Sequence, residues 1–163
     1  VQDKNFDDID EAAVKAFNIV GYGLTSSSPI QAFDHKFFLK NYDITANNKD
    51  ELLFNSCSII DEMSKNYQSK IEPKFCLSGY KIKNKMGEIL EELKDKKIIT
   101  EYEVQVGLHL AHVMSGGNTD KSKVLSERDI LKLERESFIN LISNVKTKDR
   151  IRSMLIEGKR LKN

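Results

Sequence analysis

Apolar residues recur along much of this chain at intervals of three and four, which is the spacing of one face of an α-helix. The pattern predicts a helix at residues 8–22, another at 79–97 and a third that starts at Thr100. The best candidate for a strand is short, at residues 42–45. The sequence therefore predicts a mostly α fold, a bundle of about six to seven helices with at most one short strand, in a single helical domain at residues 1–163.

Helix-capping residues set the expected boundaries of two helices in the first half. Ser28 and Pro29 are typical of a helix start, and we expect that helix to reach Phe38. Residues 48–51 form a second capping arrangement that opens another helix. Its apolar residues should turn inward: Leu52, Leu53, Cys57, Ile60 and Met63.

Three more helix starts are expected in the second half. Thr100 and Glu103 match a capping box, and Ser126 begins a helix with an apolar side. Thr147 begins a last helix, which we expect to end at Gly158. The apolar side of the helix at Ser126 comprises Ile130, Leu133, Phe138, Leu141 and Ile142.

Two histidines near the end of the helix that starts at Thr100 raise the question of a metal site. His109 and His112 are three residues apart, so both lie on one face of a helix. Zinc needs at least one more ligand; the sequence has no HExxH motif, and His35 belongs to another predicted helix. Gly116 and Gly117 follow the last periodic residues, where a helix end favours positive φ. We interpret the stretch as a helix end and predict no metal ligands.

Two glycine-containing stretches resemble nucleotide-binding loops only in part. Lys121 stands one residue too early for a P-loop that starts at Gly116, and no strand precedes it. Gly21 and Gly23 match the first two glycines of a dinucleotide fingerprint, and Asp43 lies about twenty residues further on. A helix is predicted before Gly21, where the fingerprint needs a strand. Neither stretch is expected to bind a cofactor.

Carboxylates are abundant, but they alternate with lysines and arginines at helical spacing, for example at Glu91, Glu92, Glu134 and Glu136. This arrangement is typical of a solvated helix face, and no catalytic pair stands out. No nucleophile motif such as GxSxG is present. We therefore name no catalytic, cofactor-binding or metal-binding residue.

Charge and composition argue against two classes of protein. The 26 basic residues are nearly balanced by 25 acidic ones, whereas a nucleic-acid-binding domain normally has a clear basic excess. No apolar run approaches the ~20 residues that span a bilayer, and the first residues do not resemble a signal peptide. Cys57 and Cys76 form no CxxC pair, which favours free thiols. We expect a cytoplasmic protein.

The last third of the chain carries a series of short motifs: LERESF at 133–138, KT at 146–147, RI at 150–151 and GK at 158–159. The series resembles the end of bacterial fatty-acid β-oxidation multienzymes, which join a 3-hydroxyacyl-CoA dehydrogenase to an enoyl-CoA hydratase of the crotonase-like class. Further upstream, VMSGG at 113–117 resembles a helix end of that family.

The likeness continues toward the start of the chain, down to about residue 14, and is most specific from residue 98 onward. The chain departs from the family pattern in four places. Arg160 stands where the family has proline, and Lys162 where it has arginine. His112 and His109 fall where the family commonly has tyrosine and tolerates lysine, which further argues against a metal site.

The resemblance implies a place in a larger enzyme of lipid metabolism. Residues 1–70 would be the end of a crotonase-like region, and residues 71–163 a C-terminal helical region. The implied function is structural and substrate-covering, in an enzyme that acts on acyl-CoA thioesters and uses NAD in its dehydrogenase region. The catalytic groups lie upstream in that family, so we expect this chain to be inactive alone. The alternative is a freestanding helical protein-interaction module without a catalytic role.

Two further expectations concern partners. The expected partners are the dehydrogenase and crotonase regions of the parent enzyme, acyl-CoA in the full enzyme, and a second copy of the chain. Ala13, Phe17 and Val20 are the expected seam of that homo-oligomer. A basic tail, made of Arg150, Arg152, Lys159 and Arg160, either lies near the phosphates of coenzyme A or follows the helix dipole alone.

Overall fold

The computed structural model describes residues 9–40, 42–46, 48–69 and 71–163. The chain divides into two compact units. We call residues 9–22 with 72–163 the helical core unit, and residues 23–71 the inserted unit. Each is described by itself.

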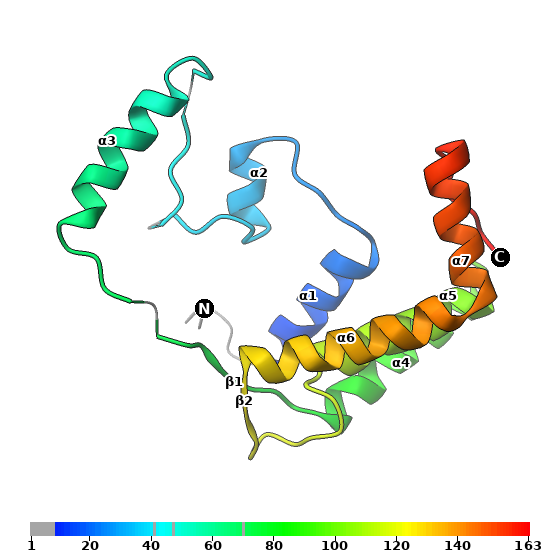
Figure 1. Cartoon of the computed structure of the whole chain (residues 1–163). Coiled ribbons are helices and arrows are strands. Elements are labelled where there is room, and N and C mark those ends of the chain that lie inside the picture. Colours follow the sequence, from blue (N-terminus) through cyan, green and yellow to red (C-terminus); the bar gives the residue numbers. More distant parts are fainter. Residues whose placement is uncertain (1–8, 41, 47, 70) are drawn as a thin grey trace. The chain divides into compact units, whose positions relative to one another are not determined.

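Six helical segments and one small sheet make up the described part of the helical core unit (Figure 1). The element bounds, in chain order, are α1 (Ile9–Gly21), β1 (Lys74–Cys76), α4 (Tyr80–Asp95), α5 (Glu101–Met114), β2 (Val124–Ser126), α6 (Glu127–Ser143), α7 (Val145–Arg152) and the π-helical turn η1 (Ser153–Glu157). Two helices belong to the inserted unit: α2 (Pro29–Asp34) and α3 (Leu52–Ser64). The predicted mostly helical fold is confirmed.

The core of the helical core unit lies where α1 packs on α4 and α5. Its buried side chains come from all three helices: Phe17, Ile82, Met86, Leu90, Val104 and Ala111. α5 also packs along α6, so α5 has neighbours on two sides (Figure 1). The predicted homo-oligomer seam is wrong at Phe17, which is buried in this core, and at Ala13, which packs against it.

Capping residues start α5 and α6 as predicted. The Thr100 hydroxyl accepts a hydrogen bond from the Glu103 N–H at 3.2 Å, and the Glu103 carboxylate accepts one from the Thr100 N–H at 2.8 Å. Ser126 and Asp129 form the same reciprocal pair. Each box satisfies backbone N–H groups that the first helical turn leaves without partners.

The last helix starts earlier than the sequence suggested. α7 begins at Val145 because the Asn144 side chain accepts a hydrogen bond from the Lys146 N–H at 2.9 Å, so the predicted start at Thr147 is wrong by two residues. Its predicted end is confirmed: Gly158 closes the final π-helical turn with a φ of 65°, a conformation that favours glycine.

The sheet joins two strands far apart in the sequence. β1 and β2 are antiparallel, with Phe75 opposite Leu125, and Leu125 is buried. The strand predicted at residues 42–45 is wrong, because Tyr42 lies in a turn and residues 43–45 have no regular structure. The backbone N–H and C=O groups of a strand need a second strand to pair with, and an apolar pattern at 42–45 does not by itself provide one.

The inserted unit differs from expectation in both of its helices. Ser28 caps α2 as predicted, by accepting from the Gln31 N–H at 3.2 Å. α2 ends at Asp34, so the predicted end at Phe38 is wrong. Lys36 has a φ of 63°, and the N–H groups of Phe37 and Phe38 both donate to the Ala32 carbonyl, which closes the helix.

α3 buries none of its residues, so the prediction that its apolar side chains turn inward is wrong. Leu52, Leu53, Cys57, Ile60 and Met63 are all exposed. The reason is the small size of the unit: among its described residues, only Ala32 is buried.

None of the helices in the described part of the chain is long and apolar enough to cross a membrane.

Candidate functional site

The stretch with the two histidines ends α5, as the sequence predicted. Ser115 is the C-cap, and Gly116 and Gly117 follow with φ values of 83° and 80°. The Gly117 N–H donates to the His112 carbonyl at 2.7 Å and so satisfies the last turn. A Cβ at Gly116 would also come within 2.7 Å of a Leu125 methyl group, so glycine is needed for space as well as for conformation.

His112 lies beside a lysine side chain. The Nδ1 atom of His112 lies 3.3 Å from the Nζ atom of Lys83, whose ammonium also reaches the Asn118 amide oxygen at 3.4 Å. Burial lowers the pKa of His112, and the positive charges of Lys83 and His109 lower it further. The positive charge of Lys83 therefore disfavours binding of a metal cation at the His112 ring. Within the described residues, no group of three or more His, Cys, Asp or Glu side chains is placed to hold a metal ion.

The partial dinucleotide fingerprint also lies at a helix end. Gly21 is the last residue of α1, and Gly23 has a φ of 61° in the segment that follows. The residues before Gly21 are therefore helical, as predicted, where a dinucleotide site would have a strand.

The helical core unit has an apolar groove of about 1090 Å³ along α5 and α6, which the end of α1 also lines. We call it the α5–α6 groove. α5 supplies Val106, Leu110 and Val113, and α6 supplies Leu131, Phe138 and Leu141. Packing between α5 and α6 leaves these side chains on a shared surface, and Phe138 keeps 58% of its surface exposed. His109 lines the groove as well.

Charged side chains form the rim of the groove. Four are basic and two are acidic: Arg135, Arg150, Arg160, Lys162, Glu103 and Glu134. The groove thus combines apolar walls with a rim that carries more positive than negative charge. This combination suits a partner that is apolar in the middle and acidic at its edge.

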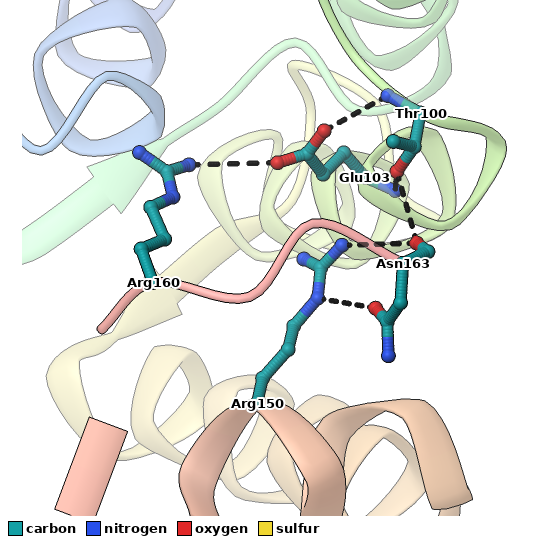
Figure 2. A network of polar contacts seen from close by, with 5 residues as sticks. All are labelled: Thr100, Glu103, Arg150, Arg160 and Asn163. Carbon is teal, nitrogen blue, oxygen red and sulfur yellow. Dashed lines mark hydrogen bonds and ion pairs between the residues drawn. The ribbon is translucent and has the colours of Figure 1, made fainter. Parts of the chain in front are cut away.

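The end of the chain is held against α5 by a polar network (Figure 2). Arg150 donates to the Asn163 side-chain oxygen at 2.7 Å and to the Asn163 backbone oxygen at 3.3 Å. The Thr100 hydroxyl donates to the same backbone oxygen at 3.2 Å. Arg160 lies 3.6 Å from the Glu103 carboxylate. Figure 2 shows both arginines pointing toward the start of α5, where Thr100 and Glu103 meet the tail.

Glu103 is the electrostatic centre of this network. Burial would raise the pKa of its carboxyl, but the Thr100 N–H bond and the charges of Arg150 and Arg160 outweigh burial and lower the pKa. Tyr102, the neighbouring residue, lies beneath the Arg150 guanidinium, with 5.0 Å from its carbon to the ring centre. Two residues of the predicted basic tail, Arg150 and Arg160, therefore have partners within the chain.

A buried carboxylate holds the start of α1. Asp10 accepts a hydrogen bond from the Ser78 hydroxyl and lies 3.7 Å and 3.5 Å from the ammonium groups of Lys81 and Lys121. A buried charge needs such partners. Asp10 thereby fastens α1 to the segment before α4 and to the loop before β2.

The carboxylates that alternate with lysines behave as a solvated face. Glu91 pairs with Lys94, and Glu92 lies 3.6 Å from Lys96, at three and four residues' separation on α4. Exposed pairs of this kind contribute little to stability.

The sequence indicated some residues of the groove and of the polar network around Glu103, but not their arrangement. The apolar residues of α6 and the basic tail were both noted, whereas the pairing of Glu103 with Arg160 was not. Glu103 was predicted as a capping residue only. Its second partner, Arg160, is 57 positions away in the sequence, and local patterns do not predict such a contact.

The part of the chain that the structure describes is mostly helical, with an apolar groove beside α5. No family model matches the chain, and no solved structure matches it. It is similar to a probable 3-hydroxyacyl-CoA dehydrogenase from Bacillus subtilis (strain 168), with 26% identity over 153 residues. The alignment covers 93% of this chain but 19% of that protein, so the chain spans about a fifth of the length of its relative.

Proposed function

We propose that the chain is the C-terminal helical part of a fatty-acid β-oxidation enzyme that acts on acyl-CoA thioesters and joins a 3-hydroxyacyl-CoA dehydrogenase to an enoyl-CoA hydratase. The observation that carries the proposal is the extent of the alignment, which takes in nearly all of this chain and a fifth of the Bacillus relative. One part of a larger enzyme gives such a match. The motifs at 133–138 and 146–159 support the C-terminal position.

In this proposal the chain is structural and covers substrate. Residues 1–70 complete a crotonase-like region and residues 71–163 form a C-terminal helical region. The acid, base and oxyanion-holding groups, and the NAD site, belong to other parts of the enzyme. The α5–α6 groove supports a covering role, because its apolar walls suit an acyl chain and its basic rim suits phosphate groups.

The activity of the isolated chain tests the first half of the proposal. The purified chain should neither hydrate crotonyl-CoA nor reduce NAD with 3-hydroxybutyryl-CoA, whereas the full product of the gene that encodes it should do both. Turnover by the isolated chain, in a preparation free of host hydratase, would contradict the proposal.

Groove variants of the full gene product test the second half. Phe138→Ser should raise KM for a long acyl-CoA more than for crotonyl-CoA, because a polar side chain weakens an apolar wall. Ile156→Ser changes an exposed residue of η1 outside the groove and is the matched control. A full gene product with no acyl-CoA activity would instead favour the freestanding interaction module, which the exposed apolar residues of α3 also suit.

A further inference from the structure

Charged side chains that line the α5–α6 groove are concentrated at one of its ends. Arg150, Arg160 and Lys162 line the groove beside Glu103, which lies in the first turn of α5. Arg160 is 3.6 Å from the Glu103 carboxylate, and Arg150 donates to Asn163, which follows Lys162 in the sequence. Figure 2 shows Glu103, Arg150 and Arg160 together at the start of α5. We call this the basic end of the groove.

The opposite end of the groove is apolar. α5 and α6 run antiparallel along it, because Leu133 in the first half of α6 lies beside Gly117, just past the end of α5. At the start of α5, the Tyr102 hydroxyl is 2.5 Å from the Thr147 hydroxyl of α7, the helix that follows α6. The apolar end is lined from the ends of α1 and α5 and the first half of α6, by side chains that include Val20, Leu110, Val113, Met114, Ile130 and Leu131.

A groove with these two ends suits a molecule that has an alkyl chain and one anionic group. Between the two ends, Glu134 and Arg135 carry opposite charges, so the positive excess of the rim lies at the basic end. The stretch of α5 from Glu103 to Met114 is about 17 Å long at the rise of an α-helix. An extended alkyl chain such as that of laurate can lie along this length, with its charged group against the arginines.

The Glu103 carboxylate already pairs with a guanidinium that such a group would meet. The capping box fixes Glu103 at the start of α5, whereas Arg160 belongs to the tail after η1. The side chain of Arg160 is 71% exposed and that of Glu103 is 11% exposed. A guanidinium carries five N–H donors, so Arg160 can also donate to an anion that enters from solvent. An anionic ligand at the basic end therefore competes with Glu103 for Arg160.

We propose that the α5–α6 groove binds an amphiphile in one direction, with its anionic group at Arg160 and Lys162 and its alkyl chain toward Met114, and that Glu103 competes for Arg160. The inference rests on the proposed function for the acyl chain; it adds the direction of binding and the residues that recognise the charged end. Two sources can supply the anionic group, namely the carboxylate of a fatty acid and the phosphates of coenzyme A.

Calorimetry with the purified full chain tests the proposal, at neutral pH and low salt, where screening is weakest. Laurate and dodecylamine have alkyl chains of the same length and opposite charges. Laurate should bind, and dodecylamine should bind roughly tenfold more weakly or not at all. Arg160→Gln should weaken laurate binding roughly threefold or more, because it removes a charged donor. Glu103→Gln should strengthen it by a similar factor, and glutamine keeps the capping box.

Lys159→Gln is the matched control. It removes the same charge from the same tail, at an exposed residue that does not line the groove, and should bind laurate like the unmodified chain. Circular dichroism spectra of all the variants should match. Equal losses in Lys159→Gln and Arg160→Gln would reduce the effect to net charge and overturn the proposal. An unmodified chain that binds neither amphiphile, or binds both equally, would also overturn it, as would unchanged laurate binding in Glu103→Gln.

Lauroyl-CoA distinguishes the two sources of the anionic group. Tighter binding of lauroyl-CoA than of laurate, with the larger loss in Arg160→Gln, would assign the basic end to phosphates, whereas tighter binding of laurate would assign it to a carboxylate. Acyl-CoA turnover by the full gene product is measured separately. Turnover combined with laurate binding that Arg160→Gln leaves unchanged would overturn this inference alone. Charge-dependent laurate binding without turnover would support the inference and contradict the proposed function.

Discussion

The helical core unit and the inserted unit are built from similar amphipathic helices, yet only the first buries its apolar faces. α4 has three buried residues and α5 also has three, whereas α3 has none. The difference lies in the neighbours and not in the helix pattern. α5 packs against α1, α4 and α6, while Leu53, Cys57 and Ile60 of α3 are exposed. Amphipathic spacing predicts which side of a helix is apolar, but tertiary contacts determine whether that side is buried.

The largest expected contrast is between core and exposed apolar residues. Met86→Ala removes a side chain with no exposed surface and should lower the free energy of unfolding by about 2–5 kcal/mol, through lost burial and the cavity left behind. Ile71→Ala, at a residue 90% exposed in the inserted unit, should change it by no more than about 0.5 kcal/mol. Urea denaturation followed by circular dichroism measures both. Equal losses would show that the inserted unit has a core of its own.

A pair of glycines with similar positive φ angles sharpens the comparison. Gly79 and Gly23 have φ values of 58° and 61°, so alanine at either site is strained, and the ψ of −127° at Gly79 lies outside the left-handed helical region as well. At Gly79 a Cβ would also overlap the backbone carbonyl of Thr119, whereas at Gly23 it meets nothing within 4 Å. We expect Gly79→Ala to cost about 1–3 kcal/mol more than Gly23→Ala in the same denaturation experiment. Similar costs would mean that the loop at Thr119 moves freely.

The smallest expected effect is a pH dependence that belongs to the helical core unit. The pKa of His112 in the folded chain is below its ordinary value of 6.5, because of burial, Lys83 and His109. The unfolded chain therefore binds more protons between pH 6.5 and the lower folded value, so stability falls as the pH falls through this window. The slope of melting temperature against pH in this window should be smaller in His112→Gln than in the unmodified chain. A slope in His112→Gln equal to that of the unmodified chain would show that His112 is not its source.

Helix ends were the part of the fold that the sequence predicted best. Ser28, Thr100, Ser126 and Gly158 all mark boundaries in the structure, because a cap acts through hydrogen bonds or backbone conformation within a few residues. Such caps can therefore be predicted from a short stretch of sequence.

Features that depend on distant segments were not predicted. β1 and β2 pair residues about fifty positions apart, and their three-residue length gives no recognisable alternation. The apolar residues of α3 were expected to turn inward because they recur at helical intervals, as the core residues of α4 also do. Likewise, the groove brings together residues of α1, α4, α5 and α6, and two of its basic residues, Arg160 and Lys162, come from the tail that returns to Glu103.

The bonds that Asn163 makes to Arg150 and Thr100 close a ring in the chain, since the Thr100 contact joins residues 63 positions apart. Terminal segments usually fray in local opening events that cost little free energy. Here α7 and η1 are fastened at both sides, by Asn144 where the segment begins and by Asn163 beyond its end. We therefore expect their amide hydrogens to exchange with solvent more slowly than those of a helix whose end makes no such contact.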